Sequence, residues 1–293
     1  MSIFYYDGFS RDGSGSNFGD DINPFLMARL LDHRIVENKN LCVMGVGTLL
    51  NDENIKNLSR FSKKIVFSTG AGYGGLTLEL DSTWDVVCVR GEGTARTLGV
   101  DYEKAICDGA VLLSNYFDVV PESCRVRKVT FIPHIKTHRL AGKVLCQVAE
   151  SLGINYLSPD INQIDFIEQV SQSRRVITEA MHGAILADTM RVPWLPVHFF
   201  EHNQFKWEDW FRSVSLDYYT NAINFSIWNP PGSVIKRAIK APYQGLKAWG
   251  VSERMKEWLT TGEFVLSKDS VLYEKKRQLG ERVDYINEKY AVS

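Results

Sequence analysis

The chain has 293 residues, of which 44% are hydrophobic, enough for a sizeable core in one large domain or two modest ones. Its 34 basic and 35 acidic side chains leave a formal net charge of −1, so no overall field favours a nucleic acid or an acidic polymer as partner. The five cysteines form no Cys-x-x-Cys pair, which argues against a disulfide framework and favours a reducing compartment. The first residues lack the pattern of a secretory signal, and no run approaches the roughly 18 apolar residues of a membrane span, so we expect a cytoplasmic protein.

Short runs rich in β-branched and aromatic residues alternate along the chain with segments of helical periodicity. In chain order, the expected strands are 3–6, 41–45, 65–68, 86–89, 129–132, 154–157, 176–178 and 194–197. Between them, helical spacing is clearest over 24–31, 93–98, 140–152, 164–170 and 183–190. This alternation predicts an α/β fold with largely parallel sheets, arranged as two doubly wound, Rossmann-like domains that face each other across a cleft.

The domain boundary is predicted in the least patterned stretch of the middle, 114–128, which contains Pro121 and clustered charges. The first Rossmann-like domain is then 1–120 and the second is 121–228. The remaining residues, 229–293, are predicted to form a basic, helical appendage to the second domain.

Glycine-rich and Asx-rich turns follow the first three predicted strands. The segment Asn17-Phe18-Gly19-Asp20 leads into a helix, for which a plain helix cap is the commoner explanation. Gly45-Val46-Gly47-Thr48 and the turn 70–75 each end a strand, where backbone amides meet phosphate or sugar groups, although neither is a dinucleotide fingerprint or a P-loop. Substrate contacts are predicted from Asn17, Gly19, Asp20, Gly47, Thr48 and Gly72.

Arg90-Gly91-Glu92-Gly93-Thr94 comes directly after the strand that ends at Val89. A guanidinium at the carboxyl edge of a sheet suits a carboxylate or a phosphate, and we predict Arg90 as a clamp for such a group. The alternative is a surface arginine paired with Glu92 or Asp108.

Two histidines follow strands of the second half, His134 after Ile132-Pro133 and His182 in the turn 178–183 that opens a helix. A helix N-terminus favours anions, and a histidine there can act as an acid or a base near neutral pH. We predict His182 as the leading acid/base and His134 as a second one or an acceptor contact, although a structural role is commoner for an isolated histidine. Glu179 is predicted to orient His182 or to cap the helix, and with Met181 to contact substrate.

Taken in order, these motifs resemble those of the polysaccharide pyruvyl transferase family over about 16–205. The matching segments are Asn17-Phe18-Gly19-Asp20, Gly45-Val46-Gly47, 70–75, Arg90-Gly91-Glu92-Gly93-Thr94-Ala95, Asp108-Gly109-Ala110, Pro133-His134 and Glu179-Ala180-Met181-His182-Gly183-Ala184. The resemblance implies a two-domain fold similar to that of B-type glycosyltransferases, with phosphoenolpyruvate in the interdomain cleft. It also implies transfer of the enolpyruvyl group of phosphoenolpyruvate to a hydroxyl pair of a sugar as a ketal. We expect the acceptor to be a lipid-linked glycan, and nothing in the motifs demands a cofactor or a metal.

The chain departs from that family at Ala180, and also at the turn positions Glu92 and Gly109, where members often have proline. Members often carry Ser-Arg-Leu-His-Gly where this chain has Glu179-Ala180-Met181-His182-Gly183, and the arginine is implied to contact phosphoenolpyruvate. Ala180 lacks that charge, so we expect Arg174, Arg175 or Lys206 to replace it. Two alternatives stay open, a nucleotide-sugar-dependent glycosyltransferase of the same architecture and a non-catalytic glycan-binding relative.

The segment 232–262 carries six basic and two acidic side chains, a balance of +4, interleaved with apolar residues. This mixture predicts a peripheral contact with the inner face of a membrane, and Pro242 and Gly245 are expected to interrupt any single helix there. The commoner alternative is that its apolar residues pack on the second domain while its lysines face water.

Overall fold

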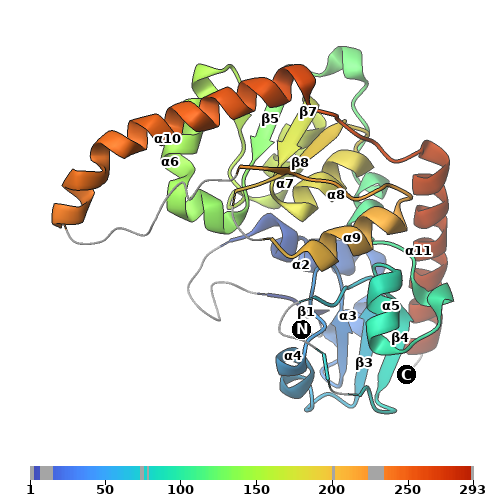
Figure 1. Cartoon of the computed structure of the whole chain (residues 1–293). Coiled ribbons are helices and arrows are strands. Elements are labelled where there is room, and N and C mark those ends of the chain that lie inside the picture. The colour runs from blue at the N-terminus through green and yellow to red at the C-terminus, as the bar shows by residue number, and fades with distance from the viewer. Residues whose placement is uncertain are drawn as a thin grey trace. The chain divides into compact units, whose positions relative to one another are not determined.

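The structure, a computed structural model, describes residues 3–6, 16–72, 76–77, 79–199, 202–223 and 234–291, with 234–245 described as backbone only. These residues form two separate parallel sheets, one of four strands and one of five, with helices between the strands (Figure 1). The predicted α/β fold with two Rossmann-like units is thereby confirmed. Among the described residues, none of the helices combines the length and the apolar character that a membrane span requires.

The first unit is built on the four-stranded sheet, in the order β1 (Ile3–Phe4), β2 (Leu41–Met44), β3 (Lys63–Phe67) and β4 (Trp84–Cys88). Its connecting helices are α2 (Phe18–Leu30), α3 (His33–Glu37), α4 (Asp52–Asn57) and α5 (Glu92–Leu98), followed by the 3-10 turns η1 (Tyr102–Lys104) and η2 (Gly109–Asn115). Met44, Val66 and Val89 lie in the core beneath them.

Two distant segments complete this first unit, which comprises Met1–Asp118, Asn203–Tyr218 and Ser267–Ser293. Helix α9 (Gln204–Ser213) packs on α5, and helix α11 (Asp269–Tyr290), dark red in Figure 1, packs on β4 and η2. This division differs from the predicted boundaries, which put α9 in the second domain and α11 in an appendage. Helices α9 and α11 join the first unit because their apolar faces are buried there. Each large apolar side chain removed from water stabilises the fold by about 1.5–3 kcal/mol.

The start of α2 also differs from prediction, because the helix begins at Phe18 and contains Pro24 in its interior. A proline has no amide to donate to the carbonyl four residues earlier, here that of Asp20. The side-chain amide of Asn23 donates to the Asp20 carbonyl at 3.1 Å in its place. The same side chain accepts from the amide of Val46 at 2.7 Å, which fixes the helix to the end of β2. Asn23 therefore compensates for the proline that follows it.

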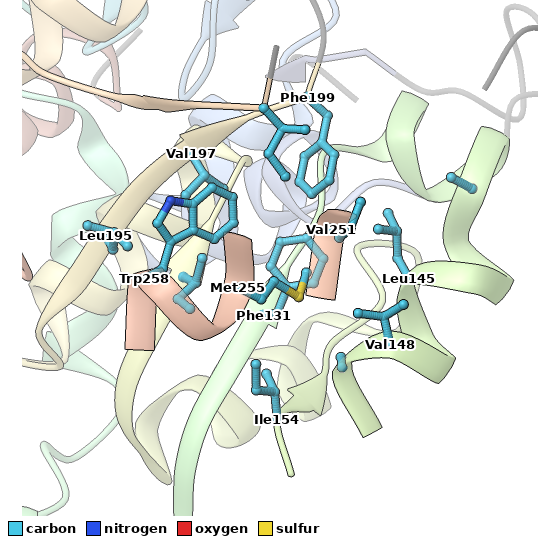
Figure 2. Packing of buried hydrophobic residues seen from close by; sticks show 14 residues of the cluster. Phe131, Leu145, Val148, Ile154, Leu195, Val197, Phe199, Val251, Met255 and Trp258 are labelled. Atoms are coloured by element: carbon cyan, nitrogen blue, oxygen red, sulfur yellow. The ribbon is translucent and has the colours of Figure 1, made fainter. Parts of the chain in front are cut away.

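The second unit comprises Val119–His202 and Tyr219–Leu266. Its sheet has the order β6 (Asn155–Tyr156), β5 (Arg127–Ile132), β7 (Ser173–Thr178), β8 (Trp194–His198) and β9 (Asn221–Ala222). Its elements also include η3 (Glu122–Cys124), α6 (Ile135–Ser151), α7 (Gln163–Ser171), α8 (Met181–Thr189) and α10 (Val234–Thr261). Figure 2 shows the core of this unit, where Phe131, Leu145 and Val197 meet Met255 and Trp258 of α10.

Helix α10 is continuous over 28 residues, so the expected interruption at Pro242 and Gly245 is wrong. An interior proline costs a helix about 3 kcal/mol. The part of α10 after the proline buries Val251, Met255 and Trp258 in the core, and this anchorage outweighs the local cost.

Candidate active site

The candidate site lies at the carboxyl edge of the sheet in the second unit. Strands β5 and β7 are parallel neighbours whose last residues, Ile132 and Thr178, are register partners. The chain leaves β5 through His134 and leaves β7 through Glu179 and His182, so both predicted histidines follow ends of the same sheet edge. Ligands of open α/β sheets bind at this edge.

Glu179 ties together the ends of three adjacent strands. One carboxylate oxygen accepts from the amide of His134, after β5, at 2.9 Å, and the other accepts from the amide of Phe199, after β8, at 3.1 Å. The side chain is 8% exposed. Burial raises the pKa of Glu179, although these two hydrogen bonds act in the opposite direction. Glu179 thus holds the loops that carry the histidines, a role that the sequence did not reveal.

The turn that carries His182 is fixed by its neighbours. The hydroxyl of Thr178 donates to the carbonyl of Ala180 at 2.9 Å and accepts from its amide at 3.1 Å. A Cβ at Gly183 would overlap that hydroxyl, so only glycine allows the helix to approach the turn this closely. His182 is the second residue of α8 and is half-buried, whereas Met181 is buried.

His134 is the N-cap of α6. Its Nδ1 accepts from the amide of Lys136 at 3.3 Å, an arrangement in which a neutral ring carries its proton on Nε2. The ring is half-buried. His134 therefore uses its Nδ1 as a helix cap, which leaves Nε2 as the nitrogen that carries the ring proton.

Five of the six histidines of the chain lie at or after the ends of β5, β7 and β8. Besides the two predicted ones they are His138, His198 and His202. His198 and His202 stack with ring centroids 4.1 Å apart, and burial lowers the pKa of His198. The available sequence signal was the spacing of four between His134 and His138, which puts two histidines on one helix face.

Two of the three cations expected to replace the family arginine lie at the opposite end of β7. Arg174 and Arg175 begin β7, whereas His182 follows its far end. The Nε of Arg174 donates to the carbonyl of Arg125 at 3.3 Å, and the guanidinium of Arg175 lies 5.1 Å from the ring centroid of Phe264. The structure therefore does not bring these two arginines to the edge that carries His182.

Lys206 belongs to α9 in the first unit. The first turns of α6 carry two other exposed cations, Lys136 and Arg139, which belong to none of the sequence motifs. Lys136 is two residues after His134, so a cation does follow the end of β5.

In the first unit, Arg90 lies at the end of β4 and is completely buried. Its partner is Asp209 of α9, with Nε and the carboxylate 3.2 Å apart, and not Glu92 or Asp108. Its other donors reach the hydroxyl of Thr48 at 2.9 Å and the carbonyl of Ala71 at 3.1 Å. The clamp role of Arg90 stays a prediction, and this geometry favours a structural role.

The surrounding motif residues accommodate this ion pair. Asp209 also accepts from the amide and the hydroxyl of Thr94, at 3.1 and 2.6 Å. A Cβ at Gly70 would overlap the guanidinium of Arg90, and a Cβ at Gly91 would overlap Asp209. The glycines near Arg90 therefore leave room for a buried arginine and its carboxylate.

The other predicted contacts of the first unit are also engaged in local bonds. The side-chain amide of Asn17 donates to Asp20 at 2.6 Å, next to the buried Gly19. Gly47 and Gly72 adopt positive φ angles of 118° and 137°, and the carbonyl of Gly72 accepts from the side chain of Asn203. The structure thus brings Gly47, Thr48 and Gly72 close to Arg90, while 73–75 of the predicted glycine-rich turn lie outside the described residues. In the described part of the chain, no group of three or more His, Cys, Asp or Glu side chains is placed to hold a metal ion.

Comparison with known proteins defines the class. The model of the family "Polysaccharide pyruvyl transferase" matches residues 5–197, which is more than half of the chain, and the protein belongs to this family. Among curated proteins, it is similar to the succinoglycan biosynthesis protein ExoV of Rhizobium meliloti (strain 1021). The two are 35% identical over 263 residues, which cover 88% of this chain and 75% of the relative. The protein is therefore a polysaccharide pyruvyltransferase that acts on a glycan.

Proposed function

We propose that this enzyme transfers the enolpyruvyl group of phosphoenolpyruvate to two hydroxyl groups of a lipid-linked glycan, forming a pyruvate ketal and releasing phosphate. The observation that carries the proposal is the edge of the second sheet, where His134 and His182 follow neighbouring strands and Glu179 holds the loops between them. This edge lies almost wholly within the residues that match the family.

The chemistry needs one acid and one base at a time. His182, as an imidazolium, protonates the methylene carbon of the donor, and the central carbon becomes cation-like. One sugar hydroxyl then forms a C–O bond to that carbon, and phosphate leaves with the electrons of the C–O bond that breaks. The second hydroxyl closes the ketal. Of the two hydroxyl protons released, one balances the proton on the methyl group and the other leaves with phosphate, and His134 is the second group able to carry one.

The test is mass spectrometry of a panel of p-nitrophenyl hexopyranosides with adjacent free hydroxyls, each incubated with enzyme and phosphoenolpyruvate. The expected product has gained one pyruvate less one water, with an equal amount of phosphate released. Sugar transfer from UDP- or GDP-hexose with no reaction of phosphoenolpyruvate would instead establish the glycosyltransferase alternative. Binding of the glycosides without any transfer would establish the non-catalytic one.

The enzyme is expected to meet a lipid-linked acceptor at the inner face of the membrane through α10. Leu246 and Trp249 of that helix are 65% and 63% exposed, and the segment 232–262 has a charge balance of +4. Large apolar side chains beside basic ones suit a surface of anionic lipids. The structure does not describe the side chains of Lys236, Arg237 and Lys240. These residues contribute to the argument only through their charges in the sequence.

Co-sedimentation with vesicles of phosphatidylglycerol and phosphatidylethanolamine tests this contact. We expect wild type to sediment at low salt and less at high salt, and a Leu246→Ser, Trp249→Ser variant to stay in solution. A matched control is Tyr273→Ser on α11, an aromatic residue that is 72% exposed. If wild type stays in solution at low salt, the membrane contact is excluded.

A further inference from the structure

A second group of polar side chains surrounds His138, one helical turn after His134. Its Nδ1 lies 2.8 Å from the hydroxyl of Tyr156 on β6, and its Nε2 lies 3.4 Å from the carboxylate of Asp160 in the following loop. The hydroxyl of Ser158 lies 3.2 Å from Nε2 and donates to Asp160. The imidazole is 23% exposed, the carboxylate is 48% exposed and Tyr156 is half-buried, so the group lies at the surface of the second unit.

Gly142 shows that the fold makes room for this arrangement. A Cβ at Gly142, one turn further along α6, would lie 2.9 Å from Nδ1 of His138 and 3.1 Å from the hydroxyl of Tyr156. A glycine inside a helix costs about 0.5–1 kcal/mol relative to alanine. At this position a larger residue would force the histidine or the tyrosine to shift.

The order of contacts is that of a proton relay. A carboxylate beside Nε2 favours the tautomer that carries the ring proton there, which leaves Nδ1 as an acceptor for the tyrosine hydroxyl. The oxygen of Tyr156 then keeps a lone pair for another donor. A hydroxyl, a base within hydrogen-bond reach and a carboxylate that orients the base are the geometric elements of an activated oxygen.

Packing holds the tyrosine in this position. Its ring lies 6.0 Å, centroid to centroid, from that of Phe131, the residue with which it pairs between β5 and β6. Burial raises the pKa of Tyr156, so the phenol stays neutral and can give up its proton only while it accepts another. This is the behaviour required of the middle member of a relay.

We propose that Tyr156, His138 and Asp160 form a relay that accepts the proton of an acceptor-sugar hydroxyl, so that the acceptor is bound beside β6. This inference rests on the proposed function. As the sugar oxygen bonds to the central carbon of the donor, its proton passes to the oxygen of Tyr156, and the tyrosine proton passes to Nδ1 of His138. Asp160 stabilises the imidazolium, which then returns its proton to the departing phosphate.

The first test is steady-state kinetics of Tyr156→Phe and His138→Gln with an acceptor identified by mass spectrometry. Loss of a positioned base costs about 100-fold or more in rate, so we expect kcat to fall by that amount in each variant while the KM for phosphoenolpyruvate stays unchanged. The matched control is His33→Gln, because His33 also lies 3.3 Å from an aspartate but is 76% exposed on α3 of the other unit. Its kcat should equal that of wild type.

Asp160 is a positioning residue in this relay and has its own test. We expect Asp160→Asn to lower kcat and Asp160→Glu to restore part of it, because a longer side chain with the same charge can still reach the ring. A wild-type kcat in Asp160→Asn, which keeps the shape of the side chain without its charge, would show that only packing matters and would reject the relay.

The outcomes separate the relay from the proposed function. If wild type forms the ketal and Tyr156→Phe retains its kcat, the relay is excluded and the proposed function stands. If wild type releases no phosphate from phosphoenolpyruvate with any glycoside of the panel, the proposed function fails and the relay fails with it. Ketal formation that is lost in the Tyr156 and His138 variants but kept in His33→Gln establishes the relay.

Discussion

The two units use their motif residues in opposite ways. In the first, Arg90 and its neighbouring glycines enclose a buried ion pair with Asp209. In the second, the buried Glu179 holds loops on which His134 and His182 remain half-buried. A motif shared within a family therefore serves assembly in one unit and leaves titratable groups at a sheet edge in the other. The two uses differ in exposure, because Arg90 is completely buried whereas His134 and His182 are half-buried.

The two units should also differ in the free energy that is lost when one member of an interaction is removed. A buried charge without its counter-ion is strongly unfavourable, whereas a half-buried histidine can be removed with little effect on folding. Substitution of Arg90 should thus change the free energy of unfolding, and substitution of His134 or His182 should change the rate.

The largest expected effect is that of Arg90→Ala. It leaves the carboxylate of Asp209 buried without its cation, so we expect a loss of about 3–5 kcal/mol in the free energy of unfolding, measured in urea. Arg90→Ala combined with Asp209→Ala should lose less than the two single changes added together, because the isolated charge is removed. A stable Arg90→Ala protein whose KM for phosphoenolpyruvate rises would instead support the clamp role.

The next effect is that of His182→Ala in the second unit. We expect a fall in kcat of about 100-fold or more, because a positioned acid is lost. The urea midpoint should stay close to that of wild type, since His182 is only half-buried. Near-normal kcat in a folded variant would remove His182 from the mechanism.

The local sequence pattern was sufficient to predict the two sheets and the positions where their strands end. Alternation of apolar runs with helical segments predicted two parallel sheets, and parallel strands place their carboxyl ends on one edge. His134 and His182 could be assigned to strand ends for this reason. The spacing of residues along the chain carries that information.

Partners far apart in sequence could not be predicted. Arg90 and Asp209 are 119 residues apart, and nothing near either one indicates that α9 returns to the first unit. The same holds for Glu179, whose carboxylate meets amides 45 and 20 residues away. Such contacts depend on how apolar faces are buried, which a single sequence does not specify.

A smaller effect is expected for Lys136→Ala. This variant tests whether Lys136 supplies the positive charge that Ala180 lacks. If Lys136 contacts the donor, its loss should raise the KM for phosphoenolpyruvate by about tenfold or more. The reason is that one hydrogen bond to a charged group contributes about 1.5–3 kcal/mol. Lys143→Ala, further along the same helix, is the control. An unchanged KM in Lys136→Ala would leave Lys206 and Arg139 as the cations to examine.

The smallest expected effect is the pH dependence of the stability that Glu179 contributes through its hydrogen bonds to two backbone amides. Because burial raises its pKa above the ordinary value of 4.5, the folded protein binds this proton more tightly than the unfolded chain does. The stability contributed by the group is therefore present below pH 4.5 and is lost as pH rises through the folded pKa. Glu179→Gln cannot titrate, so the stability of wild type relative to this variant should decline over that interval.

Urea unfolding at a series of pH values measures this decline. Glu168→Gln, on the exposed surface of α7 in the same unit, controls for the loss of one acidic group. If the wild-type advantage grows with pH, the two backbone amides outweigh burial, and Glu179 is held as a carboxylate by His134 and Phe199. The loops of the site would then depend on that negative charge, and Glu179→Gln should also lower kcat near neutral pH.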